Sequence, residues 1–182
     1  MRKTLLLTLL LPMLTFANDK VVRVTPHVEV GSFIVLPKVT ANVDAKVNVG
    51  KVNVTNFEVG GGVSQGVAIV PLRSLGEKDI VIGDTQVYGL AEVNRHFTKD
   101  FTLYGQIKLG VGVGYWIAPR GTDIDTNQDK EIIGIGSGFV FPMGQASLEG
   151  GIVYKKFNVG LNIGAPKLIA LKLGYEIPVN IK

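Results

Sequence analysis

The segment Phe101–Ile117 limits the fold of this chain more than any other part of its sequence. Its odd positions hold large apolar residues or glycine, and its even positions are mostly polar or glycine. An alternation with period two gives a β-strand with one apolar face and one polar face. Strands in soluble proteins usually have about five or six residues, whereas a tilted strand that crosses a bilayer needs roughly 9–11 residues within the hydrocarbon, with extensions at each end. The length of this segment therefore indicates a membrane-spanning strand.

The amino terminus has the features of a secretory signal peptide in their usual order. Basic residues are followed by a mainly apolar run over residues 5–11 and then by small residues. We expect cleavage between Ala17 and Asn18, so that residues 1–17 are the signal peptide and residues 18–182 form one barrel domain. The chain has no run of roughly 18 apolar residues that would span a membrane as a helix. A closed barrel can still cross a membrane, because closure satisfies every backbone amide and carbonyl group.

Composition is consistent with export and excludes several functions. The chain has 19 basic and 15 acidic residues, and two of the basic ones, Arg2 and Lys3, fall in the expected signal peptide. The rest of the chain is therefore close to neutral, so no nucleic-acid partner is expected. There is no cysteine, which rules out disulfides, thiolate catalysis and a lipid anchor on cysteine. The 23 glycines suit a crowded barrel wall, where large neighbouring side chains need space.

Alternating segments continue along most of the chain, and almost no helix is predicted. The expected strands cover residues 27–36, 39–49, 52–63, 85–97, 101–117 and 130–141, and a closing strand covers 168–181. Short turns are expected at residues 37–38, 98–100 and 142–145. Residues 64–83 are the least regular segment and are interpreted as a strand end followed by a long loop.

Residues 146–163 allow two interpretations. Their apolar side chains occupy even positions up to Tyr154 and odd positions from Phe157, so the phase changes at Lys155-Lys156. One long strand with a β-bulge explains this change, and so do two strands joined by a turn. A bulge gives eight strands and a turn gives nine or ten, whereas single-chain bacterial barrels have an even number. The predicted fold is therefore all-β, a closed antiparallel up-and-down transmembrane barrel, with eight strands favoured and ten as the alternative.

Connection lengths predict which way the barrel faces. Periplasmic turns of such barrels are short and external loops are long. The turns at 98–100 and 142–145 are therefore expected in the periplasm, and residues 73–82 and 118–129 outside. Aromatic girdles mark both membrane interfaces. We expect Phe97, Phe101, Phe139 and Phe141 beside the periplasmic turns, and Tyr115 and Trp116 near the external end.

The signal peptide, the alternation, the loop asymmetry and Leu173-Gly174-Tyr175 in the last strand resemble those of small outer-membrane β-barrel proteins of Gram-negative bacteria. The resemblance covers residues 18–182 and implies export to the outer membrane, contact with its lipids and insertion by the barrel-insertion machinery. Such proteins typically end with an aromatic residue, whereas this chain ends Asn180-Ile181-Lys182. Tyr175 would take the part of that residue if the last residues are an extension.

Four polar residues are expected to face the barrel interior: Glu92, Asn94, Gln106 and Lys108. The turn at 98–100 sets Glu92 opposite Gln106 and diagonal to Lys108, so we expect Glu92 and Lys108 to form a charge pair. A barrel of eight strands has room for side chains and little else, which favours a packed polar core over an ion-lined lumen. No catalytic residue is predicted.

The acidic segment at 123–131 has oxygen-bearing side chains at alternate positions, as at the start of a calcium-binding loop. These weak candidates for calcium ligands are Asp123, Asp125, Asn127 and Asp129. Gln128 stands where such a loop needs its glycine, and Gly134 stands where it needs a bidentate glutamate. A solvated acidic loop is the favoured interpretation, and no cofactor is predicted.

The sequence therefore predicts a monomeric outer-membrane barrel that is not an enzyme. Its structural or surface-interaction role would depend on residues 73–82 and 118–129, which would meet an extracellular ligand or a host surface of unknown identity. A small porin-like channel is one alternative, and it would need ten or more strands or a hydrated lumen. A soluble periplasmic lipocalin-like barrel is the other, and it would turn its apolar face inward around a ligand.

Overall fold

The computed structural model describes residues 21–33, 36–71, 79–117 and 138–180. Among these residues no helix is long and apolar enough to cross a membrane. The strands are β1 (Val21–Phe33), β2 (Leu36–Val52), β3 (Thr55–Val70), β4 (Ile80–His96), β5 (Phe101–Ile117), β6 (Gly138–Tyr154), β7 (Phe157–Ala165), β8 (Ile169–Tyr175) and β9 (Ile177–Asn180). The bounds of β5 are those that the alternation in the sequence predicts.

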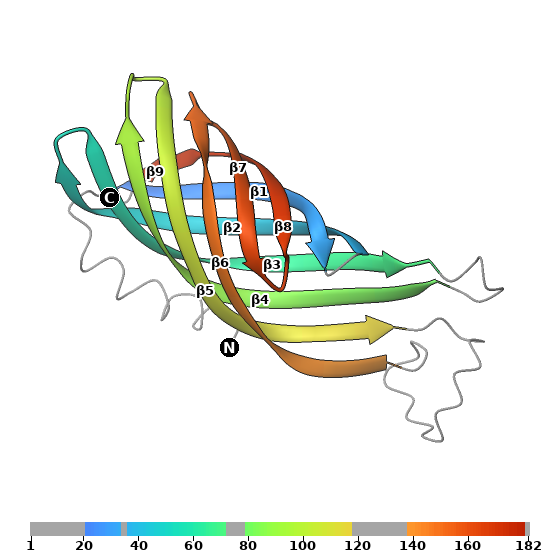
Figure 1. The fold of residues 1–182 in the computed structure, drawn as a ribbon. Coiled ribbons are helices and arrows are strands. Elements are labelled where there is room, and N and C mark those ends of the chain that lie inside the picture. The colour runs from blue at the N-terminus through green and yellow to red at the C-terminus, as the bar shows by residue number, and fades with distance from the viewer. Residues whose placement is uncertain (1–20, 34–35, 72–78, 118–137, 181–182) are drawn as a thin grey trace.

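The sheet closes on itself because β1 pairs with β2 on one side and with β8 and β9 on the other. β8 and β9 are two parts of one strand, interrupted at Glu176, since both follow the same antiparallel register along β1. The described residues therefore form a ring of eight strand positions, each antiparallel to the next (Figure 1). This ring confirms the predicted all-β, closed, up-and-down barrel, with eight strands rather than ten.

The two ends of the barrel differ in their connections. Val21 pairs with Asn180, so both ends of the described chain lie at one end of the barrel. The short connections from β2 to β3, from β4 to β5 and from β6 to β7 are at this end, which is termed the turn end. The connections from β3 to β4 and from β5 to β6 leave from the opposite end, termed the loop end (Figure 1). Residues 80–82, expected in an external loop, already belong to β4.

The predicted turn at 142–145 is wrong, because these residues lie inside β6. Residues 138–141 of the strand predicted over 130–141 belong to the same β6, whereas residues 130–137 lie outside the described residues. Pro142 lies inside β6 and pairs with Val113 of β5. β7 pairs with β6 only from Ala146 onward, so among the described residues no strand covers the other side of β6 at Pro142. Proline lacks an amide hydrogen and is tolerated in a strand at such an edge.

The phase change at Lys155-Lys156 is a two-residue turn between β6 and β7 and not a bulge. Lys155 has a φ of 58°, a left-handed conformation found in tight hairpin turns. The predicted count of eight strands is nevertheless right. The segment 146–163, predicted as one strand, is divided between β6 and β7. The described part of the strand predicted over 130–141 is continuous with residues 146–154 in β6, so the two errors leave the count unchanged.

The first hairpin also differs from the prediction. β1 begins at Val21, and Pro37-Lys38 belong to β2 instead of forming a turn. Pro37 pairs with Ser32 close to the end of the hairpin, where a missing amide hydrogen disturbs the ladder least.

The irregular segment 64–83 begins with the end of β3, which reaches Val70, as predicted, and its residues 80–83 already belong to β4. The inner face of β3 is rich in glycine, which hides the alternation of apolar and polar residues in the sequence. Gly62 is small because its neighbours fill the interior: a Cβ there would lie 2.7 Å from the ring of Tyr88 and 2.6 Å from Asp44. The residues that obscure the alternation are thus small ones, and they leave room for large side chains of adjacent strands.

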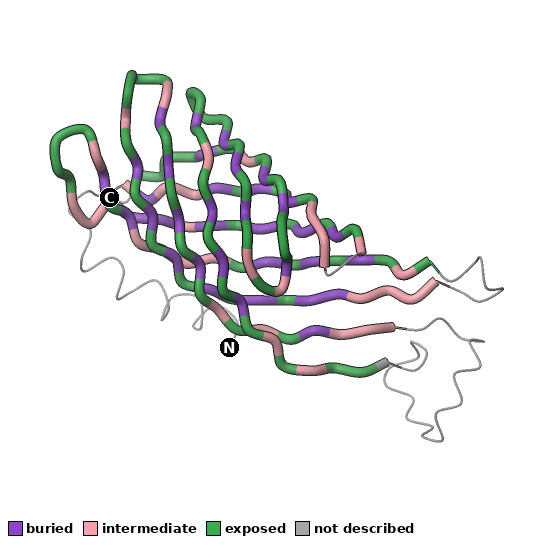
Figure 2. Tube along the Cα trace, in the orientation of Figure 1, coloured by how far each residue is buried: buried purple, intermediate pink, exposed green. Residues whose placement is uncertain are grey.

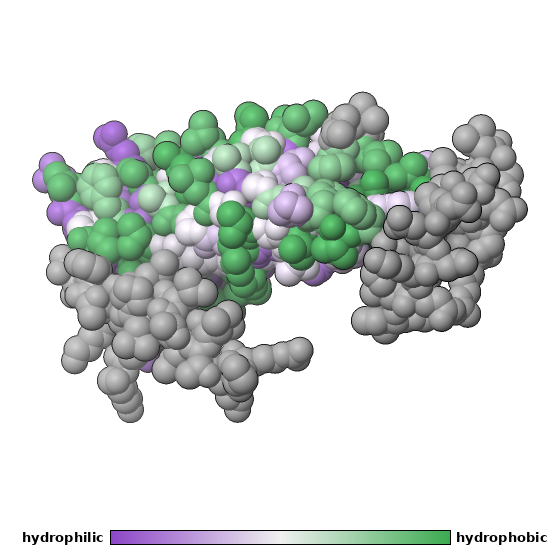
Figure 3. All heavy atoms as spheres, turned by 90° about the horizontal axis from the view of Figure 1, so that it is seen from below, coloured by the Kyte–Doolittle hydropathy of each residue, from purple (hydrophilic) through white to green (hydrophobic). Residues whose placement is uncertain are grey.

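Side chains alternate between the inside and the outside of the barrel (Figure 2). The outside carries exposed apolar residues, among them Leu109 and Val111 at 62% and 67% exposure. The inside is polar, and the largest fully buried side chains are Lys46, Lys108 and Lys172. Figure 3 shows apolar residues over the barrel wall and hydrophilic ones gathered at the turn end, on the left. Soluble proteins have the opposite distribution, because Lys is almost never fully buried in them unless paired.

Candidate functional site

Lys108 lies at the centre of a charged cluster that crosses the barrel interior. Its Nζ is 2.7 Å from a carboxylate oxygen of Glu149. Glu29 and Asp44 lie farther away, at 3.4 Å and 4.0 Å. Lys172 donates a hydrogen bond to the same Glu149 at 2.6 Å. Because these residues come from β1, β2, β5, β6 and β8, the cluster connects opposite walls of the barrel.

Two tyrosines complete this cluster. Tyr88 donates its hydroxyl hydrogen to Asp44 at 2.5 Å, and its ring centre lies 5.4 Å from the Nζ of Lys108. Tyr104 donates to Glu149 at 2.9 Å. The carboxylates thus receive hydrogen bonds from hydroxyl groups as well as from ammonium groups, which is the condition for keeping charges in a dry interior.

Glu29 is the meeting point of three further side chains. Lys167 forms an ion pair with its carboxylate. Asn162 donates to it at 3.3 Å, and the Nε2 of His27 lies 3.3 Å from it. His27 and Glu29 are both completely or almost completely buried, so these contacts replace the water that the charged group has lost.

A second layer of charges lies toward the turn end. Lys46 of β2 donates to both carboxylate oxygens of Glu92 of β4, at 2.7 Å and 2.9 Å. Asn94 donates to the same carboxylate at 2.8 Å. Arg23 forms an ion pair with Glu58 at 2.6 Å. This layer closes the interior below the cluster around Lys108.

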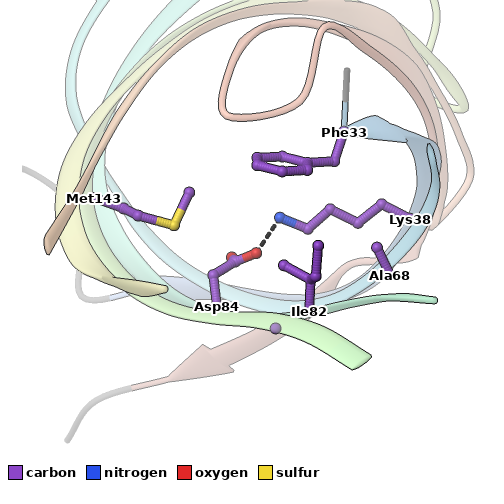
Figure 4. Close-up of a pocket in the computed structure, with 7 residues that line it drawn as sticks. Phe33, Lys38, Ala68, Ile82, Asp84 and Met143 are labelled. Carbon is purple, nitrogen blue, oxygen red and sulfur yellow. Dashed lines mark hydrogen bonds and ion pairs between the residues drawn. The ribbon is translucent and has the colours of Figure 1, made fainter. Parts of the chain in front are cut away.

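The interior is also filled toward the loop end. Lys38 of β2 and Asp84 of β4 form an ion pair over Gly66 of the intervening β3, and Phe33, Ile82 and Met143 lie around it (Figure 4). The space between the side chains lining this place is too small for a water molecule. Charges and apolar side chains therefore occupy the described interior at three levels.

The structure places all four residues predicted for the interior, Glu92, Asn94, Gln106 and Lys108, inside the barrel and buried. Glu92 lies opposite Gln106, in the expected register. The predicted ion pair between Glu92 and Lys108 is wrong. Glu92 pairs with Lys46, whereas Lys108 turns to Glu149 on the neighbouring β6. Alternation places residues on the wall, but it does not decide which direction a long side chain takes across the lumen.

Sequence reasoning missed the other members of the charged clusters. They include Glu29, Asp44, Lys46, Glu149 and Lys172. The available signal was a charged residue at an inward position of an alternating strand, which each of them satisfies. Their pairing had no signal, because the partners stand on strands that are far apart in the sequence.

Double-mutant cycles test this pairing. Lys46→Met combined with Glu92→Gln is expected to show a coupling of about 0.5–3 kcal/mol, because each single change leaves a buried charge without its partner. Lys108→Met combined with Glu92→Gln is the matched control and is expected to be additive within error. Urea unfolding of the protein in vesicles supplies the free energies. Coupling in the second cycle and none in the first would restore the pairing expected from the sequence.

Aromatic residues form a belt on the outside of the barrel at the turn end. The ring centroids of Phe97 and Phe101 are 5.9 Å apart, and those of Phe157 and Tyr175 are 5.4 Å apart. Tyr154 connects the two pairs, because its backbone pairs with Phe101 on one side and with Phe157 on the other. These five residues are termed the turn-end belt, and their position is typical of a membrane interface.

The remaining aromatic residues of the predicted girdle lie at the loop end. They are Tyr115, Phe139 and Phe141. The expectation that Phe139 and Phe141 flank a periplasmic turn is wrong, because β6 begins near them instead of ending there. Their rings stack with centroids 6.0 Å apart, and Phe139 pairs with Trp116 of β5.

The calcium-ligand candidates Asp123, Asp125, Asn127 and Asp129 lie outside the described residues. Among the residues that are described, no group of three or more His, Asp or Glu side chains could hold a metal ion.

An exposed apolar wall, an aromatic belt and a closed, charge-filled interior define the class of transmembrane β-barrels. With eight strand positions, the architecture is that of the small Gram-negative outer-membrane barrels that the sequence resembles.

No protein-family model matches the chain, and a search of curated proteins finds no match. Among solved structures, the chain is similar to Ail, the attachment invasion locus protein of Yersinia pestis, with 11% identity, a TM-score of 0.42 and coverage of 86% of this chain and 97% of that one. Ail in complex with the heparin analogue sucrose octasulfate is 13% identical, with a TM-score of 0.46 and the same coverage of 86% and 97%. Neisserial surface protein A is 9% identical, with a TM-score of 0.48 and coverage of 88% and 96%. These similarities are weak, so the function has to be inferred from the chain's own residues.

Proposed function

We propose that this chain is a protein of the bacterial outer membrane with a structural or surface-interaction role. The inverted distribution of its side chains carries the proposal: Lys108 is fully buried, whereas the adjacent Leu109 is 62% exposed. In water the outer wall would be a far larger apolar patch than soluble monomers expose. In a bilayer the same wall contacts hydrocarbon, so its exposed apolar side chains carry no free-energy cost.

The connections at the loop end are the part that would meet other molecules. Short turns and both chain ends are typical of the periplasmic side of such barrels, so the turn end supports a periplasmic assignment. The loops predicted at 73–82 and 118–129, of which residues 80–82 belong to β4, would then face the outside of the cell, where an extracellular ligand or a host surface would bind. We further propose that residues 1–17 are removed on export and that residues 18–182 are inserted as a monomer by the barrel-insertion machinery.

The lipocalin-like alternative has no support in the interior. A soluble barrel of that kind encloses an apolar ligand cavity. Here the inward positions hold ion pairs such as Lys108 with Glu149 and Lys46 with Glu92. An apolar ligand would have to displace these charges from their partners, at a large energetic cost.

Cell fractionation and gel mobility test the proposed location. The expressed chain is expected in the detergent-extractable outer-membrane fraction, and the unheated protein is expected to migrate faster than the boiled protein, because a closed barrel resists detergent until it is heated. Recovery in the soluble periplasmic fraction, with equal mobility before and after boiling, would overturn the membrane assignment.

Conductance measurements separate the structural role from the channel alternative. The buried ion pairs and the tight packing around Lys38 and Asp84 support a packed lumen. The protein reconstituted in planar bilayers is therefore expected to show no stable single-channel steps. Reproducible steps from heat-modifiable, folded protein would favour the channel.

We propose no enzymatic activity and no cofactor. The charged side chains of the described interior are engaged with one another, as Lys108 with Glu149 and Glu29 with Lys167. They are also enclosed by the wall, so a substrate has no route to them.

A further inference from the structure

The turn end carries a strongly uneven distribution of charge. Its exposed basic residues are Lys51, Arg95, Lys99, Lys155 and Lys156. Asp100 is the exposed acidic residue that accompanies them among the described residues of this end. The hydrophilic side chains that Figure 3 shows on the left belong to this end. An excess of cations at one rim attracts anions.

Two of these cations are attached to the turn-end belt. The guanidinium of Arg95 lies 5.4 Å from the centre of the Phe97 ring. The Nζ of Lys155 lies 5.6 Å from the centre of the Tyr154 ring. A cation held over an aromatic ring is placed at the boundary between apolar wall and water, where its apolar stem contacts the wall and its charge reaches outward.

Arg95 stands on the outer wall and not in the lumen. It is exposed and follows the outward alternation of Val93 and Phe97, and its partner on β5 is the outward-facing Leu103. Phe97 and Phe101 lie nearer the turn than Arg95 does. The guanidinium therefore emerges from the apolar wall itself, beside the place that an acyl chain would occupy.

The turns that carry the cations are joined into one rim. His96 donates its backbone amide hydrogen to Val54 of the β2–β3 turn at 2.8 Å. Lys155 donates to Asp100 of the β4–β5 turn at 2.6 Å, and Glu176 donates to Lys156 at 2.8 Å. These backbone bonds connect the turns into a continuous edge, so the residues that carry the cations stand at set positions around the rim.

We propose that this cationic rim, together with the turn-end belt below it, binds the headgroups of anionic glycerophospholipids in the leaflet that surrounds the turn end. The ligand needs a negative phosphate for the cations and hydrocarbon for the wall beneath, and an anionic phospholipid has both in this order. The inference rests on the proposed membrane location. It goes further, because it assigns a lipid class to one end of the barrel.

The test compares lipids retained by the folded protein. Residues 18–182 are refolded into vesicles of phosphatidylcholine with a minority of phosphatidylglycerol and then extracted in a neutral detergent, and native mass spectrometry identifies the lipids that remain bound. The protein is expected to retain phosphatidylglycerol in excess over its share in the vesicles. Arg95→Gln, Lys155→Gln and Lys156→Gln are each expected to lower this enrichment by up to about fivefold, the effect of one basic residue near an anionic surface.

Asp100→Asn is the matched control, because it removes the opposing charge from the same rim and is expected to raise the enrichment. Unchanged retention in the three basic variants, or displacement of the lipid by millimolar inorganic phosphate, would overturn the proposal. Gel mobility is recorded for every sample. Heat-modifiable protein without lipid preference contradicts the lipid site alone, whereas failure to insert into either vesicle contradicts the membrane location itself.

Discussion

Replacing Lys108 by methionine is expected to lower the free energy of unfolding by about 3–5 kcal/mol. The Nζ of Lys108 is fully buried and lies 2.7 Å from Glu149, 3.4 Å from Glu29 and 4.0 Å from Asp44. Methionine has a similar length but no charge, so three buried carboxylates lose one of their counterions. Urea unfolding of the protein in vesicles, followed by the fluorescence of Trp116, measures the change.

Gln106→Met is the matched control for this prediction. Gln106 lies on the same strand and face, is 3% exposed, and its side-chain amide has no hydrogen-bond partner in the described part of the chain. Replacing an unpartnered buried amide by an apolar side chain is expected to be neutral or stabilising. Loss of stability below about 1 kcal/mol for Lys108→Met would mean that water screens the cluster. Such a result would revive the channel alternative.

Leu109→Arg is expected to cost about 2–4 kcal/mol, because an arginine near the bilayer midplane loses its hydration. Leu109 is at the middle of β5 and is 62% exposed on the outer wall. Val52→Arg is the control: Val52 is 61% exposed, but it lies beside the turn between β2 and β3. At that depth an arginine is expected to cost about 0–1 kcal/mol.

The measurement for this pair is the fraction of heat-modifiable protein after refolding into vesicles, together with urea unfolding of the folded fraction. Gly110, the inward neighbour of Leu109, is unsuitable as the control, because a Cβ there would lie 2.5 Å from the Cβ of Tyr88. Equal effects at positions 109 and 52 would show that the wall does not contact hydrocarbon, since exposure alone is the same at both positions.

Local periodicity predicted the strands well where one face is apolar and the other is not. β5 has the predicted bounds because its outward residues from Phe101 to Ile117 are all large and apolar except Gly105. The predicted bounds were wrong where a residue type is common in turns but is also tolerated in strands. Pro142 usually breaks a strand, yet here it stands on a stretch of β6 that β7 does not cover. Pro37 suggested a turn, yet it belongs to β2.

For the candidate sites too, local periodicity predicted some features and not others. The inward position of Glu92 and Lys108 comes from the alternation alone, and the structure places both inside. Their partners could not be predicted, because alternation does not decide which of several inward charges on nearby strands a long side chain reaches: Lys46 stands two strands from Glu92, and Glu149 stands on the strand next to Lys108. Two of the five residues of the turn-end belt, Phe97 and Phe101, were predicted as part of a girdle, whereas Tyr154, Phe157 and Tyr175 were not.

The sequence by itself determined that each strand has an apolar and a polar face, since that depends only on which residues alternate along the chain. It also determined the class of barrel, because strands of this length with this alternation are stable only where hydrocarbon meets the outer face. The tertiary structure alone decided which charges neutralise one another. Closing the ring brings Glu29 of the first strand within 3.4 Å of Lys108 of the fifth. Long-range contacts of this kind depend on the register of every strand between them, which no local pattern contains.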